Sequence, residues 1–210
     1  MSDPEPDESP RSTSAQSIED FDQSYSGTPP WDIGRPQPAF LRLAEAGLIM
    51  GRVLDAGCGT GEHVLMAAAQ GLEATGVDAA PSAIAAAVRK ADDRGLRARF
   101  LVQDALRLAE LGEQFDTVLD SGLFHVFDDE DRAGYVLALG AVVRQHGRLF
   151  MCCFSDRQPG DWGPRRVGQD EIRAAFGRGW EVESIHAAQF DTNLDPPFAQ
   201  AWLATITRSW

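Results

Sequence analysis

Three glycines in one short turn are the residues whose spacing points most directly to chemistry. Gly57, Gly59 and Gly61 lie in VLDAGCGTGEH, between a run typical of a buried strand and a run typical of a helix. Glycine lets a backbone approach a bound molecule closely, and the N–H groups that begin a helix attract anions. The turn therefore predicts a ligand-binding site that includes Cys58 and Thr60. Within it, Cys58 is interpreted as a small space-filling residue and not as a nucleophile.

The spacing of these glycines distinguishes between two kinds of nucleotide ligand. The dinucleotide pattern GxGxxG requires a glycine at position 62, where this chain has Glu62. A pyrophosphate bound there would lie against a carboxylate of the same charge. The amino-acid end of S-adenosylmethionine instead carries an ammonium and a sulfonium, which favour a nearby carboxylate such as Asp55. The turn therefore favours S-adenosylmethionine as the cofactor.

Carboxylates also stand at the ends of the next three predicted strands. Asp78 ends LEATGVD, Asp104 ends ARFLVQD, and Asp120 is close to the end of FDTVLDSG. The carboxyl ends of parallel strands meet at one edge of a sheet, where this type of fold binds ligands. Asp78 suits the two ribose hydroxyls and Asp104 the adenine amino group, although Asp104 could simply cap the turn that follows. We expect Asp120 beside the methionine amine, and further cofactor contacts at the residues directly after these carboxylates: Ala79, Ala105 and Ser121.

Strand-like and helix-like runs alternate from residue 51 onward. This alternation predicts a parallel sheet with right-handed crossovers and helices on both faces. The last two strand-like runs, 180–190 and 198–210, are joined by DTNLDPP, which is too short for a crossover helix, so we expect them to pair antiparallel. The predicted fold is α/β, with a Rossmann-like, seven-stranded, mostly parallel sheet and an antiparallel C-terminal strand. The other strands are expected at 51–57, 72–78, 98–104, 115–122 and 147–154, and helices at 61–70, 81–94, 128–145 and 169–176.

The N-terminal part of the chain has a different composition. Residues 1–20 are acidic and rich in Ser and Pro, which predicts a disordered tail. Residues 21–210 are expected to form a single domain, because a chain of 210 residues is too short for two domains of this kind and a linker. Within it, residues 21–50 are predicted to form an N-terminal lid and a short helix, since four prolines between positions 29 and 38 exclude regular structure there.

Composition narrows the range of partners. The formal net charge is −13 and no Lys/Arg cluster forms a stripe, so nucleic acid is not an expected partner. No apolar run approaches the length of a membrane span, and no secretory signal opens the chain. Three cysteines, two of them adjacent, do not form a disulfide framework and fit a reducing cytoplasm, and four scattered histidines predict no metal site. We expect a monomer or a small homo-oligomer that acts on a small molecule.

Four segments resemble successive motifs of class I S-adenosylmethionine-dependent methyltransferases: VLDAGCGTG, VDAAPSAI, FLVQDAL and FDTVLDSGLFHVF. TPPWDIGRPQP and GDWGPRRVGQDEIRAAF also resemble segments of the thiopurine, thiol and halide methyltransferase superfamily, which has bacterial members that act on quinones and phenols. The resemblance implies methyl transfer to a thiol, a phenol or quinol hydroxyl, or a heterocyclic nitrogen. GLFHVF stands where plant halide and thiol members carry a cysteine-containing segment, so halide is not the expected acceptor.

The same resemblance implies roles for two residues of the N-terminal segment. In the family this segment folds over the cofactor, so Trp31 is expected to contact the methionine moiety and Gly34 to let the chain pass close to it. An aromatic face beside a sulfonium gains about 0.5–2 kcal/mol. The alternative for Trp31 is a core anchor for the lid, and the two roles are compatible.

Acceptor contacts are expected after the fourth strand and in nearby loops. His125 is the candidate general base, because its ordinary pKa suits proton transfer near neutral pH; the alternative is a histidine that only packs among apolar neighbours. Tyr25 and Phe124 are candidate walls for an aromatic acceptor, although both could be core residues. Arg165 and Arg166 could bind an anionic substituent or remain solvated loop residues.

Two other functions share parts of this pattern. An NAD(P)-dependent oxidoreductase would use the same strand–turn–helix unit, but the glycine spacing and the lack of a Tyr-x-x-x-Lys pair disfavour it. A non-catalytic S-adenosylmethionine-binding protein would keep the cofactor site and lack turnover. Binding of S-adenosylmethionine, with or without turnover, is favoured by Asp55, Asp78 and Asp104.

Overall fold

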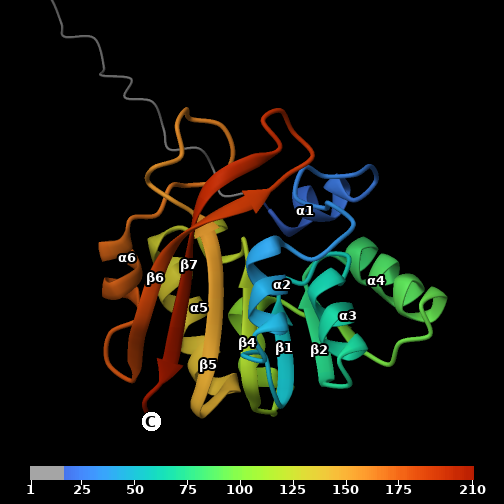
Figure 1. Ribbon diagram of the computed structural model, residues 1–210, viewed down its shortest axis with the longest axis horizontal. Coiled ribbons are helices and arrows are strands. Elements are labelled where there is room, and N and C mark those ends of the chain that lie inside the picture. Colours follow the sequence, from blue (N-terminus) through green and yellow to red (C-terminus); the bar gives the residue numbers. More distant parts are fainter. Residues whose placement is uncertain (1–16) are drawn as a thin grey trace, which may run out of the picture.

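A seven-stranded sheet with helices on both faces organises the computed structural model, which describes residues 17–210 (Figure 1). The strand order is β3-β2-β1-β4-β5-β7-β6, with parallel pairing from β3 to β5 and antiparallel pairing of β7 with both of its neighbours. The predicted fold is therefore confirmed, including the antiparallel pair near the C-terminus. The strands are β1 Arg52–Ala56, β2 Glu73–Asp78, β3 Arg99–Val102, β4 Phe115–Ser121, β5 Val143–Phe154, β6 Trp180–Asp191 and β7 Phe198–Arg208.

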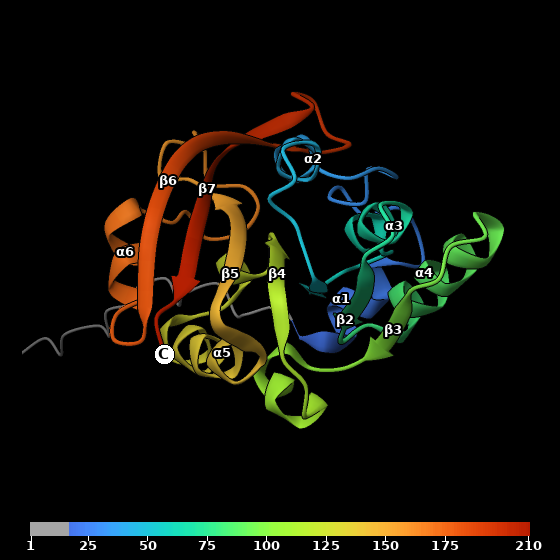
Figure 2. The same ribbon diagram turned by 60° about the horizontal axis from the view of Figure 1, so that its bottom comes forward.

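Each face of the sheet is covered by its own hydrophobic cluster. Leu54 and Val118 point toward the face that packs against the helix carrying Tyr135, whereas Val53 and Leu119 point toward the opposite face. This alternation is typical of strands that are buried on both sides. In Figure 2, α2 and α3 lie on one side of the sheet and α5 on the other. The helices are α1 Ile18–Ser24, α2 Pro38–Glu45, α3 Glu62–Ala69, α4 Pro81–Asp93, α5 Asp129–Val142 and α6 Gln169–Ala175, with two short 3₁₀ helices, η1 Ala105–Leu111 and η2 Phe124–Val126.

Helix α5 is shorter than predicted. The expected helix 128–145 ends at Val142, because Val143 already pairs with Phe115 as the first residue of β5. The pairing register then shifts, and His146 adopts a positive φ of 61° where the strand resumes. A bulge of this kind has no apolar periodicity of its own, so the helical pattern of the sequence runs across it.

The predicted boundary of the N-terminal tail is wrong. Residues 1–16 lie outside the described residues, and α1 begins at Ile18, inside the segment expected to be disordered. The Ser17 hydroxyl accepts a hydrogen bond from the Asp20 N–H, and the Asp20 carboxylate accepts one from the Ser17 N–H. This reciprocal capping box satisfies two N–H groups that would otherwise lack partners at the start of the helix.

The segment from Tyr25 to Gln37, called the N-terminal segment below, lies beyond the carboxyl ends of the central strands. In Figure 1, α1 and the turn between β6 and β7 lie beyond the same ends of these strands. Asp22 of α1 accepts a hydrogen bond from the Ser82 N–H of α4. Near its C-terminal end the N-terminal segment contacts the end of β6, since Arg35 forms an ion pair with Asp191 at 2.8 Å. None of the helices in the described part of the chain has the length and apolar character of a membrane span.

Two left-handed glycines provide a matched test of packing beside the glycine turn. A Cβ at Gly61 would lie 2.8 Å from the Phe100 ring and 2.9 Å from the Ala87 Cβ, whereas a Cβ at Gly95 would meet nothing within 4 Å. Both have a positive φ, so alanine strains the backbone at either position by about 1 kcal/mol or more. We expect Gly61→Ala to lower the free energy of unfolding in urea by about 1–3 kcal/mol more than Gly95→Ala. Equal losses would mean that Phe100 and Ala87 move aside without cost.

Candidate active site

The glycine turn leaves β1 at the carboxyl edge of the sheet and leads directly into α3. Gly57, Gly59 and Gly61 all have positive φ angles, of 69°, 52° and 86°. The Cys58 N–H donates to the Val77 carbonyl at 2.9 Å, which fixes the turn against β2. Cys58 itself is buried, in agreement with its predicted packing role. The turn therefore presents a rigid backbone without side chains at three positions.

Asp55, two residues before the turn, has an unusual environment. Its side chain is fully buried, and neither carboxylate oxygen has a hydrogen-bond partner among the described residues. The nearest ionisable group is His63, whose Nδ1 lies 3.6 Å from Asp55 Oδ2. A buried carboxylate without a partner is costly, and a cation bound over the turn would offset that cost. This observation fits the ammonium of the predicted cofactor.

Asp78 joins the end of β2 to the glycine turn. Its Oδ2 accepts a hydrogen bond from the Gly59 N–H at 2.8 Å, and its Oδ1 accepts one from the Ala80 N–H at 2.9 Å. Burial raises the pKa of Asp78, although these two N–H groups act in the opposite direction. Each carboxylate oxygen keeps acceptor capacity for one ribose hydroxyl. Ala79, which follows, is half-buried beside them.

Asp104 caps η1, as its alternative interpretation predicted. Its Oδ1 accepts a hydrogen bond from the Leu106 N–H at 2.9 Å, and Ala105 begins the helix as a buried residue. The second carboxylate oxygen makes no hydrogen bond to the described part of the chain. Capping and binding of an adenine amino group are therefore compatible, because they would use different oxygens.

Asp120 does not have the environment predicted for a methionine contact. Its fully buried carboxylate accepts hydrogen bonds from the N–H groups of Leu123 and Phe124 and from the Tyr135 hydroxyl. Burial raises the pKa of Asp120 to about 7. The carboxylate holds η2 against α5, so the expected contact with the methionine amine is not supported. Ser121 ends β4 half-buried, and its role stays a prediction.

The N-terminal segment contacts the glycine turn through Tyr25. The Tyr25 hydroxyl lies 2.9 Å from the position that a Cβ of Gly59 would take, and it accepts a hydrogen bond from Trp31 Nε1 at 3.1 Å. Tyr25 therefore lies on the cofactor side, and its predicted role as an acceptor wall is not supported. Gly34 has a φ of 68°, but nothing among the described residues lies within 4 Å of the position of its Cβ. Its glycine is explained by that backbone conformation and not by close packing.

A charged network that the sequence analysis missed joins the N-terminal segment to α3 and α4. The Thr60 hydroxyl donates to Asp32 Oδ1 at 2.8 Å and accepts from Lys90 Nζ at 2.6 Å. Lys90 and Arg94 both pair with Glu62 at 2.8–2.9 Å. Burial alone would raise the pKa of Glu62, but these two cations lower it overall. A cavity of about 340 Å³ adjoins this network. Because the partners are far apart in sequence, no local pattern could reveal them.

His125 is held as a neutral histidine. Its Nδ1 accepts a hydrogen bond from the Phe154 N–H at 2.9 Å, so the proton of the neutral ring is on Nε2. Burial, followed by the charges of Arg132 and Arg166, lowers the pKa of His125 to about 3. A group with this pKa accepts a proton poorly at neutral pH. The predicted role as a general base is therefore not supported.

Aromatic rings surround His125 at the carboxyl ends of β4 and β5. The aromatic cluster consists of His125, Phe154, Trp162 and Phe190, with successive ring centroids 4.9–6.1 Å apart. A Cβ at Gly122 would lie 3.0 Å from the Phe190 ring and 3.3 Å from His125 Nε2. His125 Nε2 therefore lies close to Gly122, directly after β4, and Phe190 packs against the same glycine. Among these residues the sequence analysis singled out only His125.

Three other predicted acceptor residues have structural partners instead. Phe124 is fully buried, stacks on Phe176 and lies under the Arg132 guanidinium. Arg165 forms ion pairs with Asp129 and Glu171, both at 2.5 Å. Arg166 donates to the carbonyls of Gln158, Gly160, Trp162 and Pro164 and lies over the rings of Phe154 and Trp162. Phe124 is core, and the two arginines shape the loop after β5.

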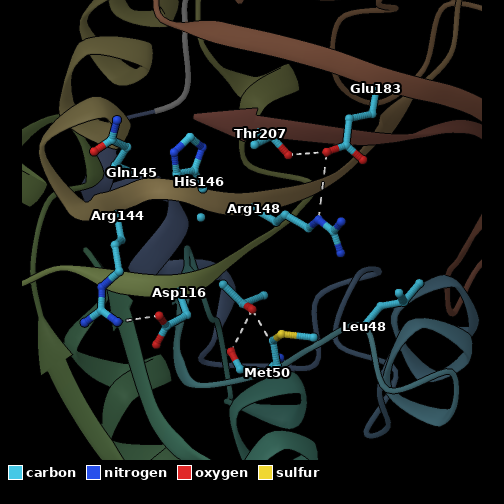
Figure 3. Close-up of a pocket in the computed structure, with 11 residues that line it drawn as sticks. Leu48, Met50, Asp116, Arg144, Gln145, His146, Arg148, Glu183 and Thr207 are labelled. Atoms are coloured by element: carbon cyan, nitrogen blue, oxygen red, sulfur yellow. Dashed lines mark hydrogen bonds and ion pairs between the residues drawn. The ribbon is translucent and has the colours of Figure 1, made fainter. Parts of the chain in front are cut away.

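A concavity larger than the one beside the glycine turn lies at the opposite edge of the sheet. It measures about 510 Å³ and is lined by residues near the amino ends of β4 and β5 (Figure 3). Its charged side chains pair with one another: Arg144 contacts Asp116 at 2.5 Å, and Arg148 lies 3.9 Å from Glu183. Ligands of parallel α/β sheets bind at the carboxyl ends of the strands. The glycine turn is therefore the better site, although this concavity has the larger volume.

Comparison with known proteins shows which family of enzymes the chain belongs to. Residues 53–147 match the family described as a methyltransferase domain. The chain is 36% identical over 186 residues to the 2-heptyl-1-hydroxyquinolin-4(1H)-one methyltransferase of Mycobacteroides abscessus, covering 83% of this chain and 82% of that protein. A solved structure described as "Conversion of a Disulfide Bond into a Thioacetal Group during Echinomycin Biosynthesis" shares 39% identity and a TM-score of 0.85, covering 92% and 93% of the two chains. Magnesium protoporphyrin IX methyltransferase of Synechocystis PCC 6803 with bound S-adenosylmethionine shares the fold, with a TM-score of 0.63, 22% identity and coverage of 90% and 80%.

These matches distinguish between the functions that the sequence left open. They support a methyltransferase over an NAD(P)-dependent oxidoreductase or a binding protein without activity. The narrower resemblance to the thiopurine, thiol and halide superfamily stays a prediction.

The carboxylate of Asp78 provides a direct test of the cofactor site. We expect Asp78→Ala to weaken binding of S-adenosylhomocysteine about 10- to 100-fold, because the loss of a charged hydrogen-bond acceptor costs about 1.5–3 kcal/mol. Glu183→Ala, at the opposite edge of the sheet, is the matched control and should leave the affinity unchanged. Isothermal titration calorimetry measures both. Equal affinity for the Asp78 variant and the parent would contradict the ribose assignment.

Proposed function

Since the chain belongs to the class I S-adenosylmethionine-dependent methyltransferases, we propose that it methylates the ionised oxygen of a heteroaromatic hydroxyl compound. The family supplies the cofactor and the transfer to a small molecule. The acceptor class is the proposed part. It rests on the neutral histidine whose Nε2 lies beside Gly122, at the carboxyl end of β4, within an aromatic cluster.

The rings of the aromatic cluster favour a flat acceptor. Phe154 and Phe190 approach each other edge to face at 5.6 Å, and Trp162 extends the cluster toward the surface with 37% of its area exposed. Aromatic pairs gain about 0.5–1.5 kcal/mol beyond their buried area, so a planar ring system would bind here better than an aliphatic one. The Mycobacteroides relative carries a hydroxyquinolinone in its name, which is a compound of this shape.

The state of His125 limits the chemistry. Bound S-adenosylmethionine supplies an electrophilic methyl carbon on a sulfonium, so the protein needs to orient the acceptor and exclude water. His125 would donate its Nε2–H to the acceptor oxygen and hold it in line with that carbon. Transfer would form the bond between the acceptor oxygen and the methyl carbon and break the carbon–sulfur bond, whose electron pair would stay on sulfur. The acceptor proton has already gone to solvent, because a histidine with a pKa of about 3 does not remove it.

A panel of acceptors tests this proposal. We expect the rate of methylation of 1-hydroxyquinolin-4(1H)-one to be independent of pH over the range in which this compound is ionised. A naphthol of similar shape, with a pKa near that of a phenol at about 10, should gain about tenfold in rate per pH unit below its own pKa. Release of S-adenosylhomocysteine between pH 6 and 10 measures both rates. A naphthol rate at pH 7 equal to that of the quinolinone would contradict the absence of a base, and faster turnover of naphthalenethiol would favour sulfur as the acceptor.

Two variants of His125 separate a donor from a base. Glutamine can present an amide N–H near the position of Nε2, whereas phenylalanine presents none. We expect His125→Phe to lose about tenfold or more in kcat/KM for the quinolinone, and His125→Gln to keep most of it, because a hydrogen bond to a charged group contributes about 1.5–3 kcal/mol. If His125 were a general base, its loss would instead lower kcat/KM of both variants by a factor of about 10²–10⁴. Equal losses in both, with unchanged thermal unfolding, would therefore restore the base assignment.

A further inference from the structure

His63, in the first turn of α3, has each ring nitrogen directed at a different part of the molecule. Its Nε2 accepts a hydrogen bond from the Gln37 N–H at 3.1 Å. A ring nitrogen that accepts carries no proton, so the proton of the neutral ring is on Nδ1. Nδ1 lies 3.6 Å from Asp55 Oδ2. The ring therefore presents a donor to Asp55 and an acceptor to the N-terminal segment.

His63 is the basic side chain beside the Asp55 carboxylate. This carboxylate is fully buried, and its two oxygens have no hydrogen-bond partner in the described part of the chain. The three other carboxylates at this edge of the sheet, Asp78, Asp104 and Asp120, each accept at least one backbone N–H. His63 is thus placed to orient Asp55, two residues before the glycine turn.

The contacts continue beyond Gln37. This residue is only 2% exposed, and its side-chain amide makes paired hydrogen bonds with the backbone of Asp191 at the end of β6. The neighbouring residue Phe190 belongs to the aromatic cluster. Phe40 of α2 packs against the His63 ring at 4.7 Å and limits its movement. A continuous path therefore leads from the cofactor side of the sheet to the aromatic cluster.

We propose that His63 is a positioning residue that couples cofactor binding at the glycine turn to closure of the N-terminal segment and to the placement of Phe190. An ammonium over the turn and the Nδ1–H of His63 attract the same carboxylate, that of Asp55. Ligand binding therefore changes the attraction between Asp55 and the His63 ring. The hydrogen bond from the Gln37 N–H transmits that change to the N-terminal segment. The proposal rests on the cofactor of the family and is independent of the acceptor.

Two substitutions divide the two functions of the ring. In His63→Asn, the amide nitrogen can replace Nδ1 as a donor to Asp55, but the shorter side chain does not reach Gln37. In His63→Gln, the amide oxygen can replace Nε2 as the acceptor for the Gln37 N–H, and the donor beside Asp55 is lost. His186→Asn, on the exposed part of β6, is the control for a histidine substitution that touches neither partner.

Calorimetry with S-adenosylhomocysteine and hydrogen exchange of residues 25–37 measure the two effects without any acceptor. In the parent protein, ligand should increase protection of residues 25–37 by tenfold or more. His63→Gln should lose at least tenfold more affinity than His63→Asn, whereas His63→Asn should lose most of the ligand-induced protection. The control should match the parent in both measurements. Parallel losses in both His63 variants, or no loss in either, would overturn the coupling.

The ring nitrogens also give a test that needs no substitution. In ¹⁵N-labelled parent protein, the chemical shifts of His63 should report a neutral ring with the proton on Nδ1, and a shift of these signals when S-adenosylhomocysteine binds. A proton on Nε2, or signals that do not respond to ligand, would overturn the proposal even if a variant failed to fold. A failed acceptor panel would leave these results unaffected, because neither measurement includes an acceptor.

Discussion

The pairing of β1 with both β2 and β4 is the constraint on which the site depends. After β1 the chain continues to α3 on one face of the sheet. After the neighbouring strand β4 it continues to α5 on the other face. The two connections diverge, and the space between them lies at the carboxyl edge of the sheet. The glycine turn follows β1 and Gly122 follows β4 at this edge. A ligand bound there would contact backbone from both halves of the sheet.

The buried carboxylates at this edge differ in how their charge is compensated. Asp120 is fully occupied by two N–H groups and a tyrosine hydroxyl, and it stabilises the turn that holds His125. Asp78 also accepts two N–H groups, yet it lies where the N-terminal segment meets the glycine turn. Asp55 lacks such partners among the described residues. A buried polar group without a partner is retained at a cost in stability, which in a native protein points to a role in binding.

Local patterns in the sequence were sufficient to predict the strands, the crossovers and the glycine turn. Each of these depends on residues within one element, such as alternating apolar positions or Gly57, Gly59 and Gly61 in a single turn. The patterns failed where partners come from distant elements. Lys90 reaches Thr60 across 30 residues and Asp191 reaches Gln37 across 154, so neither pair has a local signature. Asp120 shows the same limit, because its position near the end of a strand predicts a ligand contact, whereas its carboxylate accepts a hydrogen bond from Tyr135 of the distant helix α5.

The electrostatics around His125 connect its neutrality with the nature of the proposed acceptor. Burial has the largest effect in lowering the pKa of His125, and the positive charges of Arg132 and Arg166 lower it further. The same charges would favour the negatively charged oxygen of the proposed acceptor beside His125, since a potential that disfavours a cation attracts an anion. Arg166 is held over Phe154 and Trp162 by four loop carbonyls, so its charge stays fixed beside the aromatic cluster. This arrangement of charge therefore supports two parts of the proposal together, a neutral His125 and an acceptor that is ionised before it binds.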